Sequence, residues 1–101
     1  MPTTQDCDDQ ALAAIHADIE AAQDKFWSAD PADQNDLRLQ LADLYDAESK
    51  AKIALLKSGQ VTTDADIAKI NAIGADIGKA ADAQALGMAI ARLTAFLLTL
   101  A

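Results

Sequence analysis

The chain has few of the residues on which small catalytic or disulfide-bonded proteins depend. Among 101 residues there is one cysteine, Cys7, and one histidine, His16. A lone cysteine cannot form an intrachain disulfide, and a lone histidine cannot supply the two-histidine sets common in zinc and di-iron helical proteins. We therefore expect no metal and no cofactor. The single cysteine also favours a reducing, cytoplasmic location, and the first residues contain neither the basic nor the apolar region of a signal peptide.

Proline and glycine are scarce as well, with two and four residues. The prolines stand at positions 2 and 31, and no useful length of sequence alternates apolar and polar residues, so β-strands are not expected. The glycines at 59, 74, 78 and 87 lack the spacing of a phosphate-binding loop. Cys7 lies among aspartates, whose negative field disfavours a reactive thiolate. These absences predict a protein that is not an enzyme.

Positive charge is the third shortage, because 8 Lys and Arg residues stand against 16 Asp and Glu residues, for a net charge of −8. Binding to nucleic acid through its phosphates requires a basic patch, so we expect no nucleic-acid partner. The first 30 positions hold seven acidic residues and one basic residue, so the excess of negative charge is concentrated there. These acidic residues predict an acidic patch on the first helix, made of Asp6, Asp8, Asp9, Asp18, Glu20 and Asp24.

Apolar residues that recur at the three- and four-residue spacing of a helix are abundant. The first stripe runs through Leu12, Ile15, Ile19, Ala22 and Phe26, and the second through Leu37, Leu41, Leu44, Ala51 and Leu55. Asp30 and Pro31 suit the start of a helix, and Thr63 with Asp66 resembles a capping box. The sequence therefore predicts one all-α domain over residues 1–101, an antiparallel bundle of three helices at about 4–28, 31–58 and 63–100.

The last of these segments contains two stripes that are out of phase. Ile67, Ile70, Gly74 and Ile77 form the first, and Leu86, Ile90, Leu93, Leu97 and Leu100 form the second, about 200° away around a continuous helix. Strong helix formers over 79–86 favour one long helix, bent near Gly78. The alternative is a break between Gly78 and Asp82, with Gly78 at the C′ position and Asp82 as the next N-cap, which gives a fourth helix and a closed bundle.

Residues 83–101 carry one charge, Arg92, and are apolar on nearly every side. A long final helix would project beyond the start of the second helix and bring Arg92 beside Asp30 and Asp33. Its uncovered tip predicts an interface with a second copy or another protein. The expected interface residues are Leu86, Ile90, Leu93, Phe96, Leu97, Leu98 and Leu100. Arg92 at the middle of the run argues against a membrane span.

These features predict a small, non-enzymatic helical module that self-associates, as a dimer, or docks a protein partner through its C-terminal helix. The alternative is an acidic inhibitor or immunity-type protein, whose carboxylates on the first helix block a basic site on a target. A third hypothesis, membrane-active helices, has the apolar terminus in its favour and Arg92 and the acidic surface against it.

Overall fold

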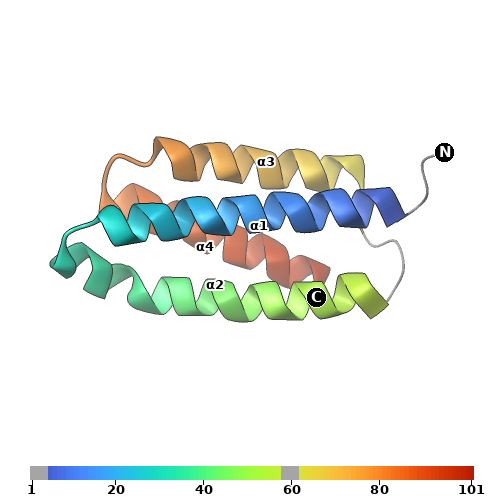
Figure 1. Cartoon of the computed structure of the whole chain (residues 1–101), viewed down its shortest axis with the longest axis horizontal. Helices are drawn as coiled ribbons and strands as arrows, with labels where there is room; N and C mark the ends of the chain where they lie inside the picture. The colour runs from blue at the N-terminus through green and yellow to red at the C-terminus, as the bar shows by residue number, and fades with distance from the viewer. Residues whose placement is uncertain (1–4, 58–61) are drawn as a thin grey trace.

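The computed structural model describes residues 5–57 and 62–101, which form four α-helices and, within those ranges, no strand (Figure 1). Helix α1 spans Gln5–Ser28, α2 spans Pro31–Lys57, α3 spans Asp64–Lys79 and α4 spans Ala83–Leu100. The predicted all-α class is confirmed. The number of helices is four rather than three, because the last predicted segment is divided.

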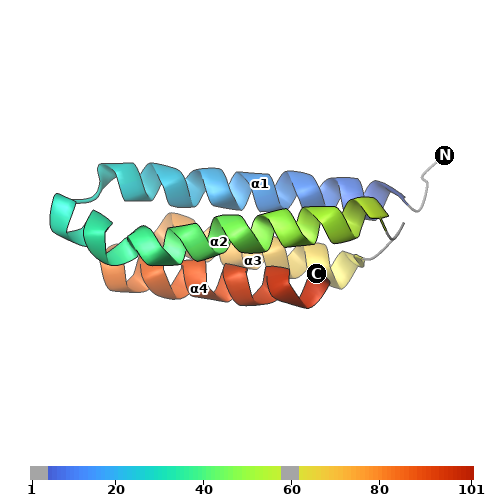
Figure 2. The ribbon, with the colours of Figure 1, turned by 90° about the horizontal axis from the view of Figure 1, so that it is seen from below.

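The four helices form an elongated bundle that measures 47 × 22 × 17 Å. Consecutive helices run in opposite directions, so α1 and α3 point one way and α2 and α4 the other (Figures 1 and 2). The most extensive packing joins α1 to α3 and α2 to α4, with a smaller interface between α3 and α4. Each half of the bundle therefore contains two parallel helices that are not adjacent in the sequence.

The division between α3 and α4 corrects the preferred prediction of one long helix. Helix α3 ends at Lys79, and Asp82 becomes the N-cap of α4, where its Oδ1 accepts a hydrogen bond of 2.8 Å from the backbone N–H of Ala85. Gly78 lies inside α3 and not at a C′ position, and the residue after the helix, Ala80, has an ordinary extended conformation. The physical reason is the phase shift, because only a reversal of the chain lets both stripes face one core.

The N-cap of α4 supports a first prediction. Replacing Asp82 with alanine should lower the free energy of unfolding by about 1 kcal/mol, because the N–H of Ala85 loses its side-chain acceptor. Urea unfolding measures the change. Asp24→Ala is the control, since Asp24 is exposed near the C-terminal end of α1, where it caps no backbone N–H, and its loss should cost less than about 0.5 kcal/mol. Equal costs for the two variants would contradict the capping role of Asp82.

The other helix ends agree with the sequence patterns that fall within the described residues. Helix α2 begins at Pro31, and α3 begins with the predicted capping box. In that box the Asp66 carboxylate accepts from the N–H of Thr63 at 2.9 Å, and the Thr63 hydroxyl accepts from the N–H of Asp66 at 3.3 Å. The predicted turn at Gly59 lies outside the described residues. These local signals position α3 for its packing against α1.

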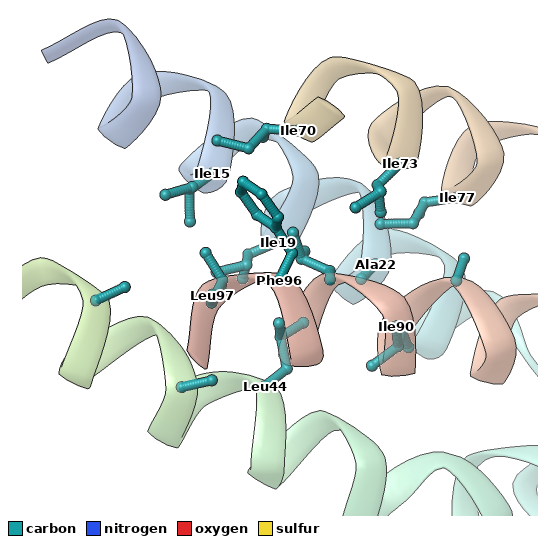
Figure 3. Packing of buried hydrophobic residues seen from close by; sticks show 14 of the residues in the cluster. Ile15, Ile19, Ala22, Leu44, Ile70, Ile73, Ile77, Ile90, Phe96 and Leu97 are labelled. Atoms are coloured by element: carbon teal, nitrogen blue, oxygen red, sulfur yellow. The ribbon is translucent and has the colours of Figure 1, made fainter. Parts of the chain in front are cut away.

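The core runs between the four helices, and side chains from every helix meet in it (Figure 3). The apolar stripes predicted for α1 and α2 supply one half, and α3 and α4 supply the other. Ile15, Ile70 and Phe96, from three different helices, belong to this one core (Figure 3). The isoleucines of α3 and the leucines of α4 thus share one interior, as the closed-bundle alternative requires.

One expected contact differs from that observed. Arg92 forms an ion pair with Asp76 of α3, with Nη1 and Oδ2 2.9 Å apart, and not with the aspartates at the start of α2. The difference follows from the reversal at Asp82, because α4 returns alongside α3 and separates it from α2. On the other side of the bundle, the Tyr45 hydroxyl of α2 accepts a 2.8 Å hydrogen bond from Gln23 of α1.

Candidate interaction surface on the fourth helix

The predicted interface residues lie mostly inside the bundle. Six of the seven side chains are buried in the core of the single chain, and these are Leu86, Ile90, Leu93, Phe96, Leu97 and Leu100. Only Leu98 is exposed, at 48%. The break before α4 explains this placement, because the helix lies along α2 and α3 and no longer projects as an uncovered tip. An interface on α4 must therefore use its other side.

The outer side of α4 carries an exposed row that we call the α4 seam, made of Gln84, Met88, Ala91, Ala95 and Leu98. Met88 is 59% exposed, and no member of the row carries a charge. Arg92 is the one charged residue in the whole helix. The solvent side of a bundle helix normally carries charged and polar residues. The α4 seam is therefore apolar where the fold itself has no need for apolar residues.

A furrow separates the α4 seam from α2. Its lining combines Met88, Ala91, Ala95 and Leu98 with polar residues of α2, among which Asp36 and Asp43 are the charged ones. Gly87 lies at its floor, where an added Cβ would come within 2.6 Å of the Gln40 side-chain oxygen. The glycine thus lets the Gln40 side chain approach the α4 backbone. This edge of the seam is acidic.

A second furrow follows the opposite edge, between α4 and α3. Its lining includes Met88 and Ala85, with Asp76, Lys79 and Arg92 as its charged residues. Asp76 and Arg92 form the ion pair described above, so Lys79 gives this edge a net positive charge. The α4 seam therefore runs between an acidic edge on its α2 side and a basic edge on its α3 side.

The predicted acidic patch on α1 is divided by the fold. Asp9, Glu20 and Asp24 are exposed, whereas Asp8 and Asp18 are each only 5% exposed. The side chain of Asp6 lies outside the described residues. Two of the six carboxylates are thus buried and are not part of an acidic surface, because α3 covers the side of α1 on which they lie.

Asp8 fastens the start of α3 to α1. Its Oδ1 accepts hydrogen bonds from the backbone N–H of Thr62 at 2.9 Å and from the Thr62 hydroxyl at 2.6 Å. Sequence reasoning missed this contact, since the two residues are 54 positions apart. The signal that could have indicated it is weak: a threonine immediately before an N-cap, whose hydroxyl can donate a hydrogen bond.

Asp18 lies at the interface between α1 and α3, with a side chain that is only 5% exposed. Its Oδ2 is inaccessible to solvent and has no hydrogen-bond partner among the described residues. Burial raises the pKa of this carboxyl group from 3.8 to about 7, because the charged form loses its hydration. The carboxylate fits there because α3 presents Gly74: a Cβ added to Gly74 would overlap Asp18 Oδ1 and lie 2.9 Å from its Cγ.

The remaining candidate groups for chemistry lie apart from one another. His16 Nε2 and Glu20 Oε1 form an exposed pair 2.8 Å apart on one turn of α1. Cys7 Sγ donates to Asp64 Oδ1 over 3.8 Å at the junction with α3. Within residues 7–57 and 62–101, no three His, Cys, Asp or Glu residues come together in a way that could hold a metal ion.

By length and composition, α4 is also the one helix among the described residues that could cross a membrane. Eight of its 18 residues are buried inside the bundle. A core helix of a soluble protein has the same composition, so this criterion is weak. Comparisons with models of protein families, with curated proteins and with solved structures find no match to the chain.

Proposed function

We propose that this protein is a non-enzymatic helical module that binds another protein chain through the α4 seam. The observation that carries the proposal is the lack of charge on an exposed helix face. The protein has a net charge of −8, and charged residues lie on the solvent sides of α1, α2 and α3. Contiguous apolar surface with polar edges is typical of a protein-binding site.

The burial of α4's large leucines changes how the proposed module works. The core residues of α4 stabilise the bundle, and the seam on the opposite side of the same helix remains available for a partner. Binding therefore requires no unfolding and no exposure of the core. The seam also has the right chemistry for a helix, since its two alanines permit close approach of backbones and Met88 adapts to irregular surfaces.

The acidic-inhibitor alternative loses part of its basis. With Asp8 and Asp18 buried, the described carboxylates of α1 that could meet a basic target are Asp9, Glu20 and Asp24. Glu20 is already paired with His16 on the same face. No feature of the described residues favours this alternative over the α4 seam.

Photocrosslinking from a defined position tests the proposed function. A benzophenone group is attached to a cysteine at Ala95 in a Cys7→Ser background, and to a cysteine at Ser49 on the exposed side of α2 as the control. In an extract of the source cell or with purified protein alone, we expect adducts from position 95 that are at least about tenfold more abundant than from position 49. Ala91→Glu should remove them, because it places a charge in the seam. Equal yields from the two positions would contradict the proposal.

A further inference from the structure

We propose that the α4 seam binds a second copy of this chain, with the two α4 helices parallel and related by a two-fold axis that runs along them. This inference rests on the proposed function, since it names the partner of the same surface. The distribution of charge on the two edges of the seam supports it, and the small residues at the centre of the seam permit it.

The spacing is that of a coiled coil. The steps from Gln84 to Met88, Ala91, Ala95 and Leu98 are four, three, four and three residues. Any row along one side of an α-helix repeats in steps of three and four, so this spacing permits coiled-coil packing against a second helix, and the edge charges decide the arrangement. The small residues Ala91 and Ala95 at its centre allow the two backbones to approach to about 8 Å. Met88 and Leu98 would close the two ends.

The charges make the surface complementary to itself. A symmetric dimer uses the same patch on both copies, so its edges must attract their symmetry mates. A two-fold rotation about an axis parallel to α4 keeps the two α4 helices parallel. It places the basic α3 edge of one copy against the acidic α2 edge of the other. Antiparallel α4 helices would place acidic edge on acidic edge. The charge distribution therefore selects the parallel arrangement.

One pair of residues follows from this geometry. Asp43 borders the furrow at the level of Ala91 and Ala95, and Arg92 lies at the same level on the opposite edge. In the parallel dimer, Arg92 of each copy comes next to Asp43 of the other. Because of the two-fold symmetry, the dimer interface would contain this pair twice. The guanidinium group has five donors, so it can retain Asp76 while it binds a second carboxylate.

Charge reversal tests the pair. Asp43→Lys and Arg92→Glu should each weaken self-association at least about tenfold, because each variant places like charges together twice. Mixed in equal amounts, the two variants should associate as a heterodimer, in which both contacts are opposite in charge. Asp46→Lys is the matched control: it changes the net charge as Asp43→Lys does, but Asp46 pairs with Lys50 on α2 and lies on neither furrow. Sedimentation equilibrium measures the association, and circular dichroism verifies that each variant is helical.

Disulfide formation tests the direction of the helices. Gln84→Cys and Leu98→Cys are made separately in the Cys7→Ser background. In the parallel dimer, each position lies next to its own copy, so both variants should form covalent dimers on oxidation. In an antiparallel seam at most one of them can do so. Crosslinking of one variant alone would overturn the proposed arrangement.

The outcomes also separate this proposal from the proposed function. A wild-type chain that remains monomeric at roughly 500 µM, while the label at position 95 captures a different protein, overturns the dimer and leaves the proposed function intact. Flotation with liposomes together with monomeric behaviour overturns the dimer as well, with a membrane as the occupant. Equal labelling from positions 95 and 49 overturns both proposals.

Discussion

At pH 8 the Asp18→Asn variant is expected to be about 3 kcal/mol more stable than the wild-type protein, and near pH 4 the two should be about equally stable. Asparagine has the same shape as aspartate, so it preserves the packing against Gly74. It removes the charge that the interface between α1 and α3 cannot hydrate. Urea unfolding at pH 4, 6 and 8 measures the difference.

The sign follows from the two pKa values. The folded protein holds the Asp18 proton up to a pH of about 7, whereas the unfolded chain releases it near 3.8. Between these values the native state binds more protons, so the free energy of unfolding falls as the pH rises and becomes level above about 7. At about 1.4 kcal/mol per pKa unit the total loss is about 4 kcal/mol. The buried amide of the variant also lacks partners, which reduces the gain.

Asp24→Asn is the control for this prediction, because it removes a carboxylate from the exposed side of the same helix. Its effect should stay within about 0.5 kcal/mol at all three pH values. A destabilisation by Asp18→Asn that is equally large at pH 4 and pH 8 would contradict the prediction. It would mean that the native structure stabilises the ionised carboxylate as well as water does, so that folding does not raise its pKa.

Local sequence signals predict the all-α class and the starts of α2 and α3. They do not settle whether the chain breaks between α3 and α4. Pro31 and the Thr63–Asp66 capping box gave the starts of α2 and α3 because proline geometry and capping act over a few residues. At residues 79–86 two local signals disagreed. Helix propensity favoured continuity, but it is a weak preference of tenths of a kcal/mol per residue. The phase shift of the apolar stripes was the stronger signal, since it involves the burial of several large side chains.

The candidate site was predicted less well, because the exposure of each α4 side chain depends on which helices pack beside α4. The sequence located the unusual apolar helix but could not say which side of it faces the core. Similarly, Asp18 lies three residues after Ile15 and four before Ala22 and so borders the apolar stripe of α1. Its burial nevertheless depends on Gly74, 56 positions away in the sequence. Nor does the sequence show that a carboxylate occupies the space beside Gly74 and that nothing lies within 4 Å of a Cβ at Gly78.

Gly74→Ala is expected to destabilise the protein by about 3 kcal/mol, although alanine is the better helix former. The new Cβ would overlap Asp18 Oδ1, and the Asp18 side chain is buried and cannot move into solvent without disturbing the packing of α1 against α3. Gly78→Ala is the matched control in the same helix. Nothing lies within 4 Å of a Cβ at Gly78, so that variant should gain about 0.5 to 1 kcal/mol. Thermal or urea unfolding of the two variants compares them directly.

The double variant Gly74→Ala with Asp18→Ala identifies the cause of the loss. If the overlap with the carboxylate is responsible, removing the carboxylate makes room for the Cβ, and the double variant should be at least as stable as the wild-type protein at pH 8. The two changes would then show a coupling of about 3 kcal/mol, which is at the upper end for residues in contact. Additive effects would instead mean that Gly74 is required by the backbone of α3 itself. Gly78→Ala combined with Asp18→Ala should be additive, because no contact joins position 78 to the carboxylate.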